Sequence, residues 1–214
     1  MEVVRVGAHE WTSSNLNVGH FRNGDAITHA QDWRSWMEAG QQEAPAWCYY
    51  VSSSLDASAD EGKKYGRLYN GFAVNDPRGL APDGWTIPDQ DQLTSMLLEI
   101  NGNQTEVDGS NVYFSDAGKL LKDGPEWGGE DRHGFRALPG GFRKVYCQEF
   151  DGAGSQGFWW SSSRDGAGNG VYLTVSTSFD YSWMPERYQS GDSVMLRVLA
   201  PESGMSVRCF REGC

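Results

Sequence analysis

The sequence contains no stretch that approaches the ~20 consecutive apolar residues of a membrane-spanning helix, so we expect no insertion into a membrane. It is also short of basic residues, with 18 Lys and Arg against 29 Asp and Glu and a net charge of −11. Nucleic-acid backbones are bound by clustered Lys and Arg, so this balance argues against nucleic acid as a partner. Met1 is followed at once by the strand-like Glu2–Val6, and we expect no cleaved signal peptide in this chain.

Motifs that mark common catalytic and metal sites are missing as well. The sequence has no GxxxxGK[ST] loop, no HExxH pair and no GxSxG elbow, and its histidines are scattered. Residues 152–157 match GxGxxG by letter, but the strand-like Phe158–Trp160 follows instead of a helix, so we interpret them as a glycine turn. Calcium held by acidic side chains of an irregular loop stays open, and the candidate ligands are Asp89, Asp91, Glu130 and Asp131.

Cysteine is scarce, and Cys48, Cys147, Cys209 and Cys214 form no CxxC pair. This spacing gives no sign of a zinc or dithiol redox site. With 214 residues the chain is long enough to bury roughly 70% of its unfolded surface, so it needs neither a metal nor a disulfide merely to fold.

Aromatic residues (13%) and 27 glycines are what the sequence has instead, and the mixture is typical of a turn-rich fold with an aromatic core. The most informative segment is residues 65–88, YGRLYNGFAVNDPRGLAPDGWTIP. Its prolines fix φ and its glycines permit tight turns, so neither a regular helix nor a long strand fits. Because the segment is too rich in aromatic and apolar side chains for a linker, we expect it to be ordered and packed against a core.

Periodicity predicts three helices before a region of short strands. The first spans about Thr28–Ala39 with Thr28 as its cap, the second begins at Pro88–Asp89 and closes at Gly102, and the third spans Ser115–Lys122. Val171–Val175 alternates as a strand should, while Val194–Leu199 and Met205–Phe210 are expected to form a terminal antiparallel pair. The fold class is therefore α+β, with short helices packed on a twisted antiparallel sheet and many irregular loops.

Short motifs spread along nearly the whole chain resemble the Fibrobacter succinogenes major paralogous domain family. They are Val6–Gly7, Trp11, Asn15–Asn17, Phe21–Asp25, Pro45–Tyr50, Tyr65–Asn70, Ala73–Pro82, Gly84–Trp85, Ile87–Pro88, Gly134–Phe135, Ala137–Gly141, Trp160–Ser162 and Ser206–Cys209. Their order and spacing together make the match specific. The resemblance implies one domain over residues 1–214 with a fold related to C-type lectins and formylglycine-generating enzymes. Cys48 and Cys209 both lie in family motifs, and whether they pair in a disulfide is left open.

Kinship with the formylglycine-generating enzymes raises an enzyme hypothesis. Those enzymes use two cysteines five positions apart, upstream of the final strand, to bind copper and activate oxygen. Cys209 and Cys214 have that separation but lie at the end of the chain, and Val171–Ala200 contains no cysteine. We therefore expect the oxidase chemistry to be absent. A hydrolase assembled from distant residues stays as an alternative.

The remaining hypothesis is ligand binding near the carboxyl end. The segment Phe179–Gly191 departs from the family pattern and is rich in aromatic side chains flanked by Ser and Gly, a composition typical of binding hot spots. Arg197–Ala200 stands where relatives carry an Asn-rich stretch. Some lectin-fold relatives in gut bacteria and their phages are diversified by retroelements that rewrite Asn codons, and the resemblance implies that this segment is variable in the same way.

From these observations we predict a non-enzymatic receptor or adhesin whose ligand is a carbohydrate or a surface protein, located at a cell surface, secreted or on a phage particle. A structural cell-surface domain is a further alternative. No cofactor is expected beyond the calcium left open above, and the oligomeric state is not predicted. The predicted ligand-binding residues are Tyr181, Trp183, Arg187, Tyr188, Met195, Arg197 and Leu199.

Overall fold

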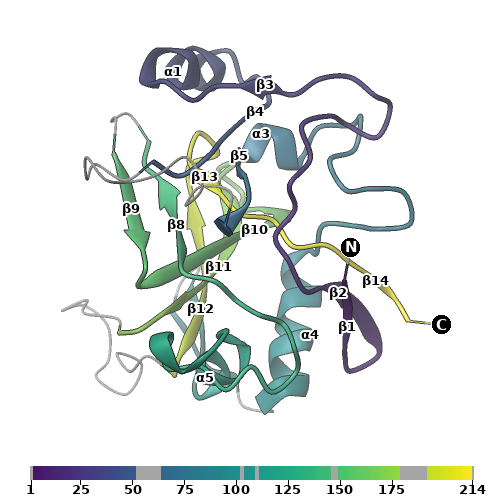
Figure 1. The fold of residues 1–214 in the computed structure, drawn as a ribbon, viewed down its shortest axis with the longest axis vertical. Coiled ribbons are helices and arrows are strands. Elements are labelled where there is room, and N and C mark those ends of the chain that lie inside the picture. Colours follow the sequence, from purple (N-terminus) through teal and green to yellow (C-terminus); the bar gives the residue numbers. More distant parts are fainter. Residues whose placement is uncertain are drawn as a thin grey trace.

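The computed structural model describes residues 2–51, 64–101, 104–108, 111–145, 149–178 and 192–213. One end of the molecule carries helix α1 (Trp33–Gln41), and the other end carries α4 (Gln90–Asn101) and α5 (Ala117–Leu121). Strands lie between these two ends, and the N-terminal hairpin lies beside the last strand (Figure 1). A one-turn helix, α3 (Gly71–Val74), and a 3₁₀ turn at Pro125–Trp127 complete the described helices. The predicted α+β class is confirmed.

The strands form one long sheet and one small sheet. The long sheet has the order β3-β4-β5-β13-β8-β10-β11-β12-β7-β6, with β9 paired to β8, and the small one has the order β1-β2-β14. Most neighbours are antiparallel, while β3–β4 and β8–β10 are parallel. The strands are β1 (Val3–Val6), β2 (His9–Thr12), β3 (Thr28–His29), β4 (Ala46–Cys48), β5 (Leu68–Asn70), β6 (Gln104–Asp108), β7 (Asn111–Phe114), β8 (Gly140–Arg143), β9 (Phe150–Ala153), β10 (Gln156–Arg164), β11 (Gly170–Ser176), β12 (Val194–Leu199), β13 (Gly204–Met205) and β14 (Phe210–Glu212).

The central strands β10, β11 and β12 bury both faces because side chains alternate along them. One face carries Trp159, Leu173 and Leu196 into a core shared with α4 and α5. The opposite face carries Phe158 and Tyr172 toward a second core, which is built largely from the irregular segment 65–88. A third, smaller cluster lies beneath α1. The sheet is therefore covered on both sides, by helices on one and by loops on the other.

Residues 65–88 are irregular yet packed, as predicted. Tyr69 and Leu80 are buried in the second core together with Trp85 and Ile87. The phenol of Tyr69 donates to the Val18 carbonyl and accepts from the Val18 amide, both at 2.8 Å. The segment thus contributes core side chains although most of it has no regular backbone.

A buried arginine ties the two ends of the chain to the middle. The Arg208 guanidinium donates hydrogen bonds to Asn15 Oδ1 and to the carbonyls of Thr12, Phe135 and Arg136 at 2.6–2.7 Å. Burial lowers its pKa to about 9, although the charges of Asp131 and Cys209 act in the opposite direction. Because these four partners are neutral oxygens, the interaction is a set of charge-assisted hydrogen bonds rather than an ion pair.

The second and third helices match their predictions closely. Asp89 and Gln92 form a reciprocal capping box at the start of α4, in which each side chain accepts from the other's backbone N–H at 2.8 Å. The first helix begins at Trp33, five residues after the predicted start at Thr28. Thr28 and His29 pair with β4, and the N-cap is Asp32, whose Oδ1 accepts from Ser35 N at 3.0 Å. Residues 28 and 29 have helical spacing, but their pairing with β4 places them in a strand instead.

The predicted terminal antiparallel pair is wrong. Both edges of β12 are occupied by β11 and β7, so the chain after Leu199 pairs elsewhere. Residues 204–205 lie between β5 and β8, and residues 210–212 pair with β2.

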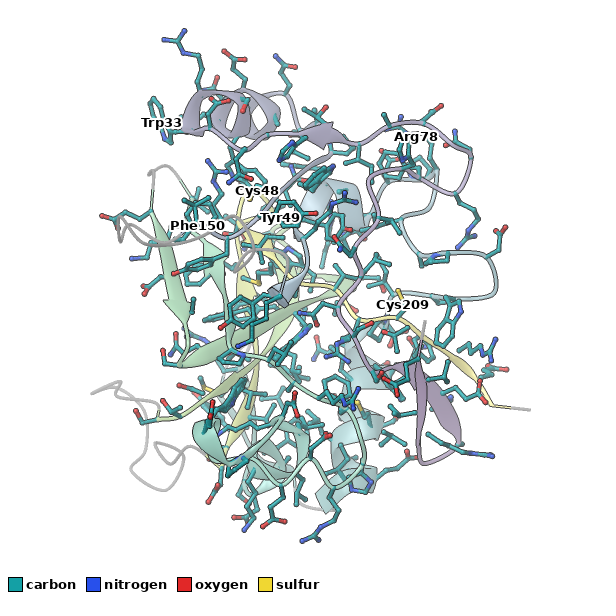
Figure 2. The ribbon with its side chains drawn as sticks, viewed as in Figure 1. Trp33, Cys48, Tyr49, Arg78, Phe150 and Cys209 are labelled. Atoms are coloured by element: carbon teal, nitrogen blue, oxygen red, sulfur yellow. The ribbon has the colours of Figure 1, made fainter. Side chains whose placement is uncertain are left out.

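The Cys48–Cys209 disulfide does not form. Both cysteines are free and buried, and they belong to different hydrophobic clusters. Figure 2 shows Cys48 below α1 and Cys209 well away from it, near the last strand. Burial raises the pKa of Cys48 to about 11 and that of Cys209 to about 12.

Candidate functional site

A pocket of about 370 Å³ opens between the β8–β9 hairpin and the strands β10–β12. We call it the aromatic pocket. Its lining residues are Phe142, Lys144, Val145, Asp151, Gln156, Phe158, Tyr172, Arg197, Val198, Leu199 and Ser203. Its size falls in the lower part of the ~300–1,000 Å³ range of small-molecule pockets.

Strand register explains how distant residues meet in the aromatic pocket. Tyr172 is directly opposite Arg197 on the β11–β12 ladder, and Gly170 is opposite Leu199. Because alternate residues face the same side, Leu173 and Leu196 point into the helical core while Tyr172 and Arg197 point to the pocket side. Gly170 has no side chain, and a Cβ there would meet the Trp160 ring at 2.7 Å.

The floor of the aromatic pocket is a chain of three rings. The Phe142 and Phe158 ring centroids are 4.6 Å apart, and those of Phe158 and Tyr172 are 6.0 Å apart, in tilted arrangements. Phe158 and Tyr172 are buried, whereas Phe142 is half-buried. Tyr172 also meets Trp160 edge to face at 6.1 Å, which anchors the floor to the second core. The floor is therefore apolar and held in place by its neighbours.

The rim carries charges of both signs. Lys144 Nζ lies 3.0 Å from Asp151 Oδ2 and 3.4 Å from Glu149 Oε2, and the hydrogen bond with Asp151 is the main reason the Lys144 pKa is raised. Arg197 Nε donates a long hydrogen bond of 3.4 Å to Asn111 Oδ1. Ion pairs near the surface, such as those of Lys144 with Asp151 and Glu149, contribute little to stability, so a ligand can replace one of these partners at small cost in free energy.

Ser203 brings an unsatisfied hydroxyl to the aromatic pocket. The residue is 0% exposed, it lines the pocket, and its Oγ has no hydrogen-bond partner. The turn at residues 200–203, closed by the hydrogen bond from Ser203 N to the Ala200 carbonyl at 3.0 Å, sets its position just before β13. A buried polar group without a partner costs about 1–3 kcal/mol of stability and is rare in proteins. An unpartnered hydroxyl in the lining of a pocket therefore indicates a site where a ligand can supply the missing hydrogen bond.

Two of the predicted ligand-binding residues lie in the aromatic pocket and one does not. Arg197 and Leu199 line it. Met195 shares their strand but is 0% exposed, paired between Thr174 and Tyr113, so we remove it from the binding surface. Tyr181, Trp183, Arg187 and Tyr188 lie outside the described residues.

Sequence reasoning missed most of the aromatic pocket. Phe158 and Tyr172 were assigned only to strands and Gln156 only to a glycine turn, while Phe142, Lys144 and Asp151 were assigned no role. One signal was available. Phe158 and Tyr172 each lie in a predicted strand, and side chains of neighbouring strands can share one face of a sheet. Ser203 carried no sequence signal, since its burial depends on strand pairing that was predicted wrongly.

Two other hollows lie on the described part of the molecule. One, the polar hollow, has a volume of about 410 Å³ and is lined by Ser13, Ser14, Asn15, Asn17, Lys64, Tyr65, Gly66, Asp123, Arg136 and Leu138. The other lies beside α1 and is lined by the exposed Trp33 and by Phe150, both labelled in Figure 2. The aromatic pocket differs from both in combining an apolar floor with a buried, unpartnered hydroxyl in its lining.

Metal binding receives no further support from the acidic residues proposed as calcium ligands. In the part of the chain that the structure describes, no three His, Cys, Asp or Glu side chains gather as a metal-binding group. Asp89 caps α4, Asp131 Oδ1 accepts from Arg136 N at 2.8 Å, and Glu130 pairs with Arg132. Calcium binding stays a prediction that the described residues do not test.

The architecture and the pocket define an α+β domain in which an irregular, aromatic-rich shell covers a mixed sheet. The sequence profile of the Fibrobacter succinogenes major domain matches residues 4–211, and the chain belongs to that family. No curated protein and no solved structure matches the chain. None of the helices in the described residues is long and apolar enough to span a membrane.

Proposed function

We propose that this protein is a non-enzymatic ligand-binding module with a C-type-lectin-like scaffold, and that the aromatic pocket is its binding site. The observation that carries the proposal is a concave, apolar-floored pocket whose lining includes the buried, unpartnered Ser203 hydroxyl. Ligand sites in proteins are mostly apolar, with a few placed polar groups that fix orientation. Arg197 and Leu199, predicted from sequence to face a ligand, lie in this pocket.

Binding is favoured over catalysis by the location of the perturbed groups. Active sites gather titratable side chains whose pKa values are strongly shifted. Among the described residues, such shifts occur at Cys48, Tyr69, Arg78, Lys122, Arg208 and Cys209, and none of these six lines the aromatic pocket. The charged groups that line it are Lys144, Asp151 and Arg197 at its rim, an arrangement suited to orienting a ligand.

The test is a binding screen against glycans and displayed surface proteins with a variant that fills the aromatic pocket. Leu199→Trp adds a bulky ring at the half-buried rim and is expected to abolish binding of any ligand found. Leu98→Trp is the matched control, because Leu98 is exposed on α4, which packs against the opposite face of the sheet. Equal binding by wild type and Leu199→Trp would show that the ligand binds elsewhere.

Retroelement diversification of the carboxyl-terminal segment is part of the same proposal. It rests on the resemblance stated above and on the position of Arg197 and Leu199 in the pocket lining, where changes alter a binding surface without entering the helical core. A reverse-transcriptase gene and an adenine-rich template copy beside the coding sequence are expected. A locus with neither would overturn this part while leaving the pocket untouched.

A further inference from the structure

We propose that the aromatic pocket recognises a sugar unit that carries a carboxylate, such as a hexuronic acid. This inference rests on the proposed function and names the class of ligand. Three features of the lining carry it: the balance of charge, the unpartnered hydroxyl, and the apolar floor bounded by fully paired strands.

The charge balance in the aromatic pocket is opposite to that of the whole chain. The lining contains two cations, Lys144 and Arg197, and one acid, Asp151, whereas the chain as a whole has a net charge of −11. Lys144 also reaches Glu149, but that contact is long, 3.4 Å, and Glu149 is exposed. An entering carboxylate can therefore replace a weak surface contact of Lys144 and meet the guanidinium of Arg197, whose planar fork matches carboxylate geometry.

The polar groups suit a ligand rich in hydroxyls. A serine hydroxyl both donates and accepts, and Ser203 Oγ has no partner among the residues that the structure describes. Gln156 also lines the aromatic pocket with an amide that can donate and accept, and its Nε2 makes one long hydrogen bond of 3.4 Å to Ser176 Oγ. Sugar hydroxyls need paired donors and acceptors of this kind at close range.

The walls favour a compact ring over an extended peptide. Phe142 and Leu199 are half-buried and offer an apolar surface to the C–H face of a sugar ring. The strands β8, β10 and β11, which carry the floor, are each paired on both sides, so a peptide strand cannot join them. A volume of about 370 Å³ admits one or two sugar rings.

The test compares sugars that differ only in the carboxylate. The ¹⁵N-labelled protein is titrated with glucose and glucuronate, galactose and galacturonate, and mannose and mannuronate, and dissociation constants are read from amide shifts. At least one acidic sugar is expected to bind about tenfold more tightly than its neutral partner, the gain typical of a charge-assisted hydrogen bond. Arg197→Gln is expected to remove most of this difference.

Arg132→Gln is the matched control, because it removes the same charge from an exposed arginine that pairs with Glu130 outside the aromatic pocket. Lys144→Gln gives a second arm at a half-buried position if Arg197→Gln does not fold. Equal binding of acidic and neutral sugars, or binding of peptides alone, would overturn the carboxylate inference. Loss of that peptide binding in Leu199→Trp would still support the proposed function, whereas a ligand unaffected by Leu199→Trp would overturn both.

Discussion

Two buried serines that lie three residues apart are expected to respond to alanine with opposite signs. Ser203 Oγ has no partner, while Ser206 Oγ accepts a hydrogen bond from Asn15 Nδ2 at 3.1 Å. Both residues are at most 2% exposed. Removing the unpartnered hydroxyl relieves a desolvation penalty of about 1–3 kcal/mol, so Ser203→Ala should raise the free energy of unfolding by about 1 kcal/mol. Ser206→Ala should lower it by about 1 kcal/mol, since a buried donor of Asn15 loses one acceptor.

The assay is urea unfolding followed by circular dichroism, with thermal unfolding as a second readout. For a chain of this length, 1 kcal/mol corresponds to about 2–4 °C in Tm. The two variants should therefore differ by roughly 4–8 °C, with wild type between them. Ligand affinity adds a third readout, because Ser203→Ala should weaken binding in the aromatic pocket while stabilising the free protein.

The reasoning is refuted if Ser203→Ala destabilises the protein as much as Ser206→Ala does. That result would mean that the Ser203 hydroxyl is satisfied in the free protein and has no hydrogen bond to offer a ligand. If Ser203→Ala is more stable than wild type but binds the ligand with unchanged affinity, the desolvation argument holds. Ser203 would then not be part of the binding site.

Three further outcomes are expected. Arg208→Met should lower the free energy of unfolding by about 3 kcal/mol or more, because three buried oxygens and one partly buried oxygen lose their donor, and each buried acceptor left unpaired costs about 1–3 kcal/mol. Urea unfolding measures the change, and a loss below about 1 kcal/mol would contradict the role we assign. Burial lowers the Lys122 pKa from 10.5 to about 8, so the folded state binds fewer protons between these values. Wild type should therefore gain about 3 kcal/mol relative to Lys122→Met as pH rises from 8 to 10.5, and a flat difference would show an ordinary pKa. Iodoacetamide with peptide mapping should leave Cys48 and Cys209 unmodified in the native protein and modify both in urea, since both thiols are buried with raised pKa values.

Local signals were sufficient where the structure is decided locally. The α4 start followed from Asp89 and from the apolar face that includes Leu93 and Leu97, and the structure adds the reciprocal bond with Gln92. The order of residues 65–88 followed from composition alone, because aromatic area of that amount must be buried. The short motifs also predicted the family correctly, since the family profile matches residues 4–211.

Contacts between distant segments could not be predicted in the same way. Thr28 has a capping side chain, but pairing with Ala46 draws it into a strand. Met195 alternates outward with Arg197, yet its neighbours Thr174 and Tyr113 leave it fully buried. The aromatic pocket draws its lining from five strands and their adjoining turns, so it exists only once the register of the sheet is known.

The most direct measurement is an amide shift map of the ¹⁵N-labelled protein titrated with the tightest ligand from the screen. Binding in the aromatic pocket should move the amides of Lys144, Gln156, Arg197 and Leu199 together, along one binding curve. Shifts confined to the polar hollow around Asn15, with those four amides unmoved, would contradict the assignment.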